Sequence, residues 1–309
     1  MMNQTRLGQT ELFVSEIGLG CMNLGTDEQQ ATSIIDEAIR SGINYLDTAD
    51  LYNFGENEKI VGKAIKGRRD DLVIATKGGN HFEVGQDGWY WDPSKAYLKE
   101  AVKNSLLRLG LDDVDLYQLH GGTIEDPIDE VVEAFEELQQ EGLIRHIGLS
   151  SIRPNVIKSF VNRTTISSVM MQYSLIDRRP EETMLDYLQN HRVSVVARGA
   201  LGKGMLTDKG LEQWHKKGQD GFLDYNGEDL KTLVETVQGT ATTFGVSPQS
   251  VAMSYALEHP TVSSLVLGAS SPEQVQNNIE AYHNQPTYAD IQPYLQQGLK
   301  EQIYQQHRA

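Results

Sequence analysis

Eight short apolar runs alternate with amphipathic segments along the chain, and this alternation constrains the fold more than any other feature. The runs are SEIGLGC, NYLD, DLVIAT, DVDLYQLH, LIRHIGLS, SSVMMQY, VSVVAR and SSLVLGA. Short runs rich in β-branched residues are typical of strands buried on both faces. Strands that alternate with helices form parallel sheets, and eight such units favour closure into a (β/α)8 TIM barrel. An open, doubly wound sheet is the alternative that periodicity leaves.

Helical segments lie between these runs, and several carry recognisable ends. They span residues 27–42, 92–110, 126–142, 154–161, 182–190, 247–258 and 271–281. Asp27 and Gln30 fit a capping box at the start of the first segment, and Gly42 can end it. Asp92 and Pro93 can open the second segment. The pattern therefore predicts a ring of helices outside a parallel barrel.

The chain is predicted to form one domain over residues 1–309. A length of 309 residues suits a single barrel, and no linker, low-complexity stretch or charge block marks a second domain. The opening TRLGQTELFV predicts a short hairpin that caps the closed end of the barrel. Two long excursions, residues 78–93 and 203–230, leave from the C-terminal ends of strands, where a barrel keeps its active site.

The acidic charge limits the partners that the chain can take. Its formal net charge of −16 repels nucleic-acid backbones and anionic membranes. The single cysteine, Cys21, excludes an intramolecular disulfide and suits a reducing cytosol. The polar N-terminus lacks the apolar core of a signal peptide, and no apolar run approaches the length of a membrane span. We therefore expect a cytoplasmic enzyme that is a monomer or a weak homo-oligomer.

Polar side chains stand at the C-terminal ends of the predicted strands. They are Asp47, Lys77, His120, Ser150, Ser151, Gln172 and Arg198, and Tyr52 follows Asp47 in the next loop. A lone lysine, histidine or tyrosine near a strand is more often solvated or packed than functional. Equivalent strand ends of a barrel meet at one mouth, however, so together these residues predict a shared site.

Four of these residues make a chemically coherent set. A buried Asp47 is costly unless it is paired, and Lys77 is its natural partner. A cation beside a phenol stabilises the phenolate, so Lys77 prepares Tyr52 to give a proton to a carbonyl oxygen. His120 adds a hydrogen-bond donor that fixes the direction of the carbonyl. The set predicts a small-molecule carbonyl substrate.

The same strand ends lack the groups that other chemistries need. There is no Gly-x-Ser-x-Gly elbow, and the eight histidines are scattered along the chain. His120 alone cannot supply the clustered ligands of a metal-dependent hydrolase, so no metal site is predicted. Proton delivery to a carbonyl without a nucleophile implies that a hydride comes from a bound cofactor.

These motifs together resemble the aldo-keto reductase family, and the resemblance covers essentially the whole chain. GINYLDTADLYNFGENE is similar to the family's aspartate–tyrosine signature, DLVIATKGG to its lysine strand and DVDLYQLHGG to its histidine strand. GLIRHIGLSS and MMQYSLIDRRPEE resemble its fifth and sixth strand ends, and LGKGMLT and LVLGASSPEQVQNNIEA its two cofactor-binding segments. The resemblance, to a prokaryotic-type member, implies a TIM barrel that reduces aldehydes or ketones with NAD(P)H.

The resemblance also implies roles for individual residues. Asp47, Tyr52, Lys77 and His120 match the family's catalytic tetrad, with Tyr52 as the general acid. The implied cofactor-binding positions are Ser150, Ser151 and Gln172 for the nicotinamide carboxamide, then Arg198, Leu201 and Lys203, and finally Gly268, Ser270, Ser271, Gln274 and Asn278.

Three departures from the family pattern bear on the cofactor. Ser151 stands where the family usually has asparagine, and a hydroxyl replaces only part of an amide's bonding. Arg198 stands where an aromatic side chain often stacks on the nicotinamide, and a guanidinium plane can also stack. The segment around Ser270 lacks the lysine or arginine that the family often carries there. We therefore expect NADP(H) to be preferred and NAD(H) to be accepted as well.

A non-enzymatic alternative is also open. Some proteins of this fold resemble the auxiliary β-subunits of potassium channels, which bind the cofactor and act mainly as interaction modules. The complete tetrad and the lack of an amphipathic arm in the sequence favour an enzyme. The substrate is open too, because Trp89, Tyr90, Trp91 and Tyr225 could line a pocket or simply pack their own loops. The C-terminal tail, from Tyr288, reads as a polar helix.

Overall fold

The computed structural model describes residues 2–83, 85 and 87–308, and its centre is a closed parallel barrel. The barrel strands run in the order β3 (Ile17–Gly20), β4 (Tyr45–Asp47), β5 (Val73–Gly78), β8 (Val114–Leu119), β9 (Ile144–Ser150), β10 (Ser168–Gln172), β11 (Ser194–Arg198) and β12 (Val262–Gly268). Pairing of β12 with β3 closes the ring. Two antiparallel pairs lie outside it, β1 (Gln4–Arg6) with β2 (Phe13–Ser15) and β6 (Asn80–His81) with β7 (Tyr90–Trp91). The predicted (β/α)8 TIM barrel is confirmed.

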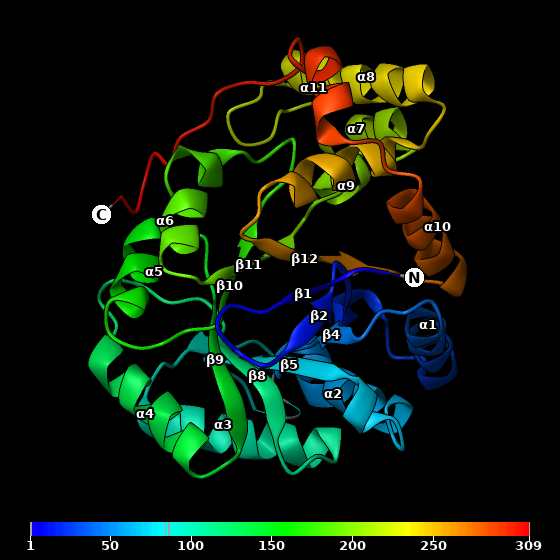
Figure 1. Cartoon of the computed structure of the whole chain (residues 1–309). Helices are drawn as coiled ribbons and strands as arrows, with labels where there is room; N and C mark the ends of the chain where they lie inside the picture. Colours follow the sequence, from blue (N-terminus) through cyan, green and yellow to red (C-terminus); the bar gives the residue numbers. More distant parts are fainter. Residues whose placement is uncertain (1, 84, 86, 309) are drawn as a thin grey trace.

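Helices surround the strands, as Figure 1 shows. They are α1 (Glu28–Arg40), α2 (Glu56–Ala64), α3 (Lys95–Leu109), α4 (Ile128–Gln140), α5 (Pro154–Val161), α6 (Met184–Asn190), α7 (Gly210–Lys217), α8 (Gly227–Phe244), α9 (Pro248–Glu258), α10 (Pro272–His283) and α11 (Tyr288–Leu295). In α4, Val131, Phe135 and Leu138 are fully buried while Glu133 and Glu136 face solvent, as expected of an outer helix. None of the described helices has the length and apolar character needed to cross a membrane.

Several helix ends agree with the sequence. Asp27 caps α1 by accepting a hydrogen bond from the backbone N–H of Gln30, and Gly110 ends α3 in a left-handed conformation. The N-cap of α3 is Ser94, however, and not Asp92 as the sequence suggested. Asp92 instead accepts a hydrogen bond from the backbone N–H of Ser94, so it supports the cap from outside the helix.

The sequence pattern does not predict α2. Asn57 and Glu58 in its first turn are fully buried polar residues, and they interrupt the apolar periodicity of its inner face. Gly62 lets this helix approach the end of α3 closely, since a Cβ at this position would lie 2.2 Å from the backbone oxygen of Leu109. Polar burial and a close crossing, rather than an apolar stripe alone, therefore define α2.

The N-terminal hairpin, β1 and β2, closes the end of the barrel at which the strands begin. Leu7, Leu12 and Val14 join the cluster of apolar side chains that fills the barrel interior. The backbone N–H of Gly8 donates to the Oγ of Ser194, which is the first residue of β11. The hairpin therefore lies against the N-terminal ends of the strands, and the predicted cap is confirmed.

The two excursions are more ordered than open loops. Residues 78–93 contain the β6–β7 pair, in which Trp91 packs over Gly79 while Trp89 and Tyr90 are mostly exposed. The segment from 203 to 230 contains α7 and the start of α8, which the sequence did not predict, and its Tyr225 is buried in the core. Trp91 and Tyr225 pack, as one of the two alternatives expected, whereas Trp89 and Tyr90 are exposed, which neither alternative predicted.

The C-terminal tail is helical only over α11. Residues 296–308 form turns and irregular backbone, and hydrogen bonds hold them to segments that follow the C-terminal ends of the barrel strands. The backbone N–H of Arg178 donates to Gln302 Oε1 at 2.6 Å, and the backbone N–H of Asn155 donates to the backbone oxygen of His307 at 3.0 Å. The predicted polar helix is therefore wrong for most of the tail, and these bonds bring the tail over the barrel mouth.

The close crossing of α2 and α3 gives a stability test. We expect Gly62→Ala to lower the free energy of unfolding by roughly 1–3 kcal/mol, because a backbone atom blocks the added methyl group. The matched control is Gly239→Ala in α8, where an added Cβ would meet no described atom within 4 Å. Gly239→Ala should raise the free energy of unfolding by about 0.5–1 kcal/mol, because alanine loses less backbone entropy than glycine on folding into a helix. Equal effects of both changes in urea titrations would contradict the close crossing.

Candidate active site

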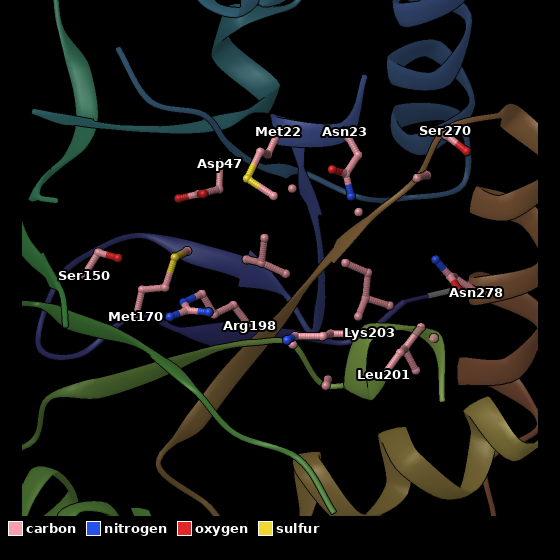
Figure 2. Close-up of a pocket in the computed structure, with 18 of the residues that line it drawn as sticks. Met22, Asn23, Asp47, Ser150, Met170, Arg198, Leu201, Lys203, Ser270 and Asn278 are labelled. Atoms are coloured by element: carbon pink, nitrogen blue, oxygen red, sulfur yellow. The ribbon is translucent and has the colours of Figure 1, made fainter. Parts of the chain in front are cut away.

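One large cavity opens at the C-terminal ends of the barrel strands. Its volume is about 1420 Å³. Among the predicted site residues, it is lined by Asp47, Tyr52, His120, Ser150, Ser151, Arg198, Leu201, Lys203, Gly268, Ser270, Gln274 and Asn278. Figure 2 shows Ser150 at one side of the cavity and Ser270 and Asn278 at the other. The structure thus brings predicted residues from five strand ends, those of β4, β8, β9, β11 and β12, to one mouth.

Lys77 lies directly behind the cavity wall and is fully buried. Its Nζ donates to Asp47 Oδ1 at 2.5 Å, to the backbone oxygen of Thr48 at 2.7 Å and to Tyr52 Oη at 3.1 Å. These three bonds use all three donors of the ammonium group. Burial alone would lower the pKa of Lys77, but the charge of Asp47 and the contact with Tyr52 outweigh it and raise that pKa. Lys77 is therefore held as a cation against the Tyr52 hydroxyl.

Gln118 is a part of this arrangement that the sequence did not reveal. It is fully buried in β8, and its Nε2 donates to Asp47 Oδ2 at 3.0 Å. Burial raises the pKa of Asp47, while the charge of Lys77 and the hydrogen bonds from Lys77 and Gln118 oppose that rise. Both carboxylate oxygens of Asp47 are thereby occupied, and the carboxylate is fixed in orientation toward the lysine.

The loop that carries Tyr52 is held by its own backbone and by α2. Asn53 and Phe54 have positive φ angles of 48° and 51°, and Gly55 follows with a φ of 88°. This left-handed run reverses the chain directly after Tyr52 and starts α2. The buried amide of Asn57 then donates to the backbone oxygen of Cys21 at 2.7 Å. The position of Tyr52 therefore depends on a short, locally strained turn anchored to the β3 end.

His120 completes the inner wall of the cavity. Its ring meets that of Tyr52 edge to face, with centroids 5.9 Å apart. Burial, with the positive charges of Lys77 and Arg198, lowers the pKa of His120 to about 3. Its buried Nδ1 has no hydrogen-bond partner among the described residues. His120 is therefore a neutral imidazole beside Tyr52.

The predicted carboxamide-binding residues are only partly together. Ser150 and Ser151 line the cavity, and Ser151 Oγ also accepts a hydrogen bond from the backbone N–H of Arg153 at 3.2 Å. Gln172 is not among the described lining residues, and its Oε1 accepts a hydrogen bond from Arg198 Nη1 at 3.3 Å. Arg198 itself lies within the cavity, beside Met170 in Figure 2. Gln172 therefore contacts a residue of the cavity wall, Arg198, without lining the cavity itself.

In the segment after β12, too, some of the predicted cofactor-binding residues line the cavity and others do not. Ser270 and Gln274 line the cavity, and Gln274 Oε1 accepts a hydrogen bond from the backbone N–H of Ser270 at 2.7 Å. Ser271 is not among the described lining residues, because its side chain caps α10 by accepting from the backbone N–H of Gln274. A Cβ on Gly268 would lie 2.7 Å from Asn23 Nδ2, so this glycine keeps the wall open to Asn23.

The cavity has further lining residues that the sequence reading did not select. They are chiefly Met22 and Asn23 after β3, Arg153 after β9, Lys209 and Lys217 around α7, and His307 in the tail. Met22 and Asn23 could have been found, since GLGCMN is the end of the first strand and the same rule applies to it. The other residues had no local signal, because their positions depend on long-range packing.

Positive charge is concentrated on this wall. Five basic side chains line the cavity, namely Arg153, Arg198, Lys203, Lys209 and Lys217. None of the five pairs with a carboxylate within 4.0 Å among the described residues, although Asp208 also lines the cavity. Arg178 and Arg179, by contrast, pair with Glu181 and Asp177. The cavity of an acidic protein is thus a site suited to anions.

Within the described residues, no group of three or more histidine, cysteine, aspartate or glutamate side chains is arranged to hold a metal ion. The polar groups that line the cavity are chiefly hydroxyls, amides and basic side chains, with Asp47, Asp208, His120 and His307 at separate places on the wall. A closed barrel with such a mouth is characteristic of enzymes that bind an organic ligand at the strand ends.

Comparisons with known proteins identify the family. The family model described as "Aldo/keto reductase family" matches residues 16–293. The chain therefore belongs to the aldo/keto reductase family, as the sequence motifs indicated. It is 53% identical over 309 residues to the uncharacterized oxidoreductase YqkF of Bacillus subtilis (strain 168), with 100% of both chains covered. It is 30% identical to the NADH-specific methylglyoxal reductase of Escherichia coli (strain K12), covering 94% of this chain and 96% of that protein.

A solved structure gives the same result. The holo form of the aldo-keto reductase AKR11C1 from Bacillus halodurans superposes with a TM-score of 0.93 at 52% identity, and each chain is covered completely, to 100%. The apo form of AKR11C1 gives a TM-score of 0.85. The chain is therefore an oxidoreductase of this family, and its barrel resembles the holo form of AKR11C1 more closely than the apo form.

The low pKa of His120 predicts a pH effect on stability. The unfolded chain takes up a proton on this residue near pH 6.5, whereas the folded chain does so only near pH 3. Stability from this source is therefore present above pH 6.5 and is lost as the pH falls, by roughly 1 kcal/mol per pH unit. Between pH 7 and pH 4.5, wild type should lose more unfolding free energy than His120→Gln.

The control for this experiment is His283→Gln, which removes an exposed histidine of α10. It should follow the wild-type pH dependence in the same urea titrations. Parallel losses of stability in wild type and His120→Gln would show that His120 is protonated in the folded state.

Proposed function

We propose that this protein is an NADP(H)-dependent oxidoreductase that reduces an aldehyde or ketone to an alcohol, with Tyr52 as the general acid. The observation that carries the proposal is the contact of Tyr52 Oη with the buried ammonium group of Lys77, at the wall of the cavity. A cation in that position favours release of the phenolic proton. A neutral His120 stands beside the hydroxyl to orient the substrate.

The residues act on the proton side of the reaction. The carbonyl oxygen lies between Tyr52 Oη and the imidazole of His120, whose Nε2–H donates a hydrogen bond to it. As negative charge develops on that oxygen, Tyr52 transfers its proton, and Lys77 stabilises the phenolate that remains. Asp47, oriented by Gln118, keeps Lys77 charged and in place. The nicotinamide dinucleotide, when bound, supplies the hydride to the carbonyl carbon.

The residues of the cavity fit such a dinucleotide. Ser150 and Ser151 offer hydroxyls for the carboxamide, and the Arg198 guanidinium offers a flat face to the nicotinamide ring. The unpaired ammonium groups of Lys203 and Lys209 are available to the pyrophosphate. The open wall at Gly268 and Asn23 leaves room for the ribose, so the carboxamide, the nicotinamide ring, the pyrophosphate and a ribose find groups of suitable chemistry.

The preference between the two dinucleotides is proposed to be modest. Ser270 and Gln274 can hydrogen-bond a 2′-phosphate but cannot neutralise it, while Lys217 adds a cation elsewhere on the wall. Neutral hydrogen bonds contribute less than charged ones, so NADP(H) is favoured and NAD(H) is used as well. The name of the Escherichia coli relative, an NADH-specific reductase, supports use of the second cofactor within the same family.

We further propose that residues 1–309 form a single domain that acts in the cytoplasm as a monomer or a weak homo-oligomer. The interior clusters support one domain, because apolar side chains from the hairpin and from the strands pack together. The single cysteine, Cys21, is free and buried, which suits a reducing compartment.

Removing the Tyr52 hydroxyl tests the general acid. We expect Tyr52→Phe to reduce kcat by roughly two to four orders of magnitude, while the Kd for NADPH stays within about threefold of wild type. The control Tyr90→Phe removes a hydroxyl from an exposed tyrosine of β7 and should keep full activity. Unchanged turnover in Tyr52→Phe would contradict the assignment, and a wild type that turns over no carbonyl would favour the interaction module.

Adding a cation at Ser270 tests the cofactor preference. Ser270→Arg should raise the ratio of kcat/KM for NADPH over NADH by roughly tenfold, and the gain should shrink as salt is added. Ser270 is the better position than Ser271, because Ser271 caps α10. The control is Ser33→Arg on the exposed side of α1. Wild type that rejects NADH a thousandfold would show that a basic residue such as Lys217 or Lys203 already reads the phosphate.

A further inference from the structure

Arg153 is a cation on the cavity wall that the proposed reaction does not yet use. It follows β9 and lies directly before α5, at whose start it is the N-cap residue. Its Nη1 donates to the backbone oxygen of Gly122, and its side chain makes no other hydrogen bond to the described residues. An arginine has five N–H donors. Most of the hydrogen-bonding capacity of this guanidinium is therefore free for a ligand.

The place of Arg153 is close to the reacting groups. Gly122 follows His120 by two residues, and both of these residues line the cavity with Arg153. The backbone N–H of Arg153 donates to the Oγ of Ser151 at 3.2 Å, so the short turn before Arg153 links it to a second residue of the cavity wall. A guanidinium held on the loop that follows His120 lies on the substrate side of the mouth, because the proposed carbonyl position is between His120 and Tyr52.

The surroundings of Arg153 leave space for a substituent. Gly121 and Gly122 have φ angles of 138° and 106°, and neither places a Cβ on this wall. His307 of the C-terminal tail lines the same cavity, held there by the bond from the Asn155 backbone N–H to its oxygen. The wall next to the reaction centre is thus open, polar and positively charged.

The charge of Arg153 has no carboxylate partner in the part of the chain that the structure describes. Arg163, which follows α5, pairs with Asp129, whereas Arg153 has no carboxylate within 4.0 Å among the described residues. Arg153 is only half-buried, so a ligand can reach it from the cavity, and a ligand anion would supply the charge partner that the described residues do not. A carboxylate matches the planar fork of a guanidinium and binds it through two parallel hydrogen bonds.

We propose that the substrate is a carbonyl compound that also carries a carboxylate, and that Arg153 binds this carboxylate while the carbonyl oxygen lies between Tyr52 and His120. The inference rests on the proposed function, because it takes the reaction centre from it. It assigns Arg153 a role in specificity: the residue selects acids among the aldehydes and ketones that fit the cavity, and it takes no part in proton transfer.

A matched pair of substrates tests the proposal. 4-Formylbenzoate and methyl 4-formylbenzoate share the aldehyde and ring, and they differ in the charge of the group opposite. Wild type should prefer the acid, and Arg153→Gln should lower kcat/KM for the acid tenfold or more while that for the ester changes less than about threefold. Arg153→Lys should recover part of the loss. The control Arg163→Gln should leave both values unchanged.

Two results would overturn the proposal. One is a wild type that reduces the ester as well as the acid, and the other is an equal loss for both substrates in Arg153→Gln. Binding of benzoate, measured by calorimetry with wild type and Arg153→Gln, separates this inference from the reaction itself. Benzoate that binds wild type and not the variant supports the anion site even if neither aldehyde is reduced, whereas equal binding to both proteins refutes it.

Discussion

The ammonium group of Lys77 is buried at the centre of the site, and the arrangement around it follows from the need to satisfy that charge. An ammonium ion removed from water needs an acceptor for each of its donors and a negative charge close by. Asp47, the backbone of Thr48 and the Tyr52 hydroxyl meet this need together. The geometry that stabilises the buried lysine is therefore the same geometry that places a cation against the phenol.

Much of this arrangement could be predicted, because the C-terminal ends of all the strands of a barrel lie close together at one mouth. Asp47 ends β4 and Lys77 lies near the end of β5, and the two strands are paired in the sheet. His120 follows β8, the next strand around the ring. Once eight units had been recognised, chemically active residues far apart in sequence had to lie close together. The periodicity of apolar residues predicted the strands, and the site followed because barrel enzymes carry their active sites at the C-terminal ends of the strands.

The residues that escaped prediction are those whose position depends on packing rather than on strand ends. Gln118 lies within an apolar strand and has no neighbour in sequence that marks it as functional. His307 reaches the cavity only because the tail is tied to Asn155 and Arg178. Gln172 and Ser271 are a different case, because a motif does not determine which of its side chains point into the cavity. The side chain of Gln172 pairs with Arg198, and that of Ser271 caps α10.

The order of strands around the barrel has a consequence for how such a protein can change over time. The proposed proton-transfer residues belong to β4, β5 and β8 and the loops that follow them, whereas most of the proposed cofactor residues follow β9, β11 and β12. The two sets occupy separate arcs of the ring, which adjoin where β8 pairs with β9 and are separated on the other side by β3, paired with both β12 and β4. The proton-transfer residues lie between Asp47 and His120 in the sequence, and these cofactor residues lie from Ser150 onward, so separate segments of the chain carry the two sets. Gene segments encoding the two arcs can therefore diverge at different rates, so that cofactor choice is remodelled while an older apparatus for acid catalysis is inherited unchanged.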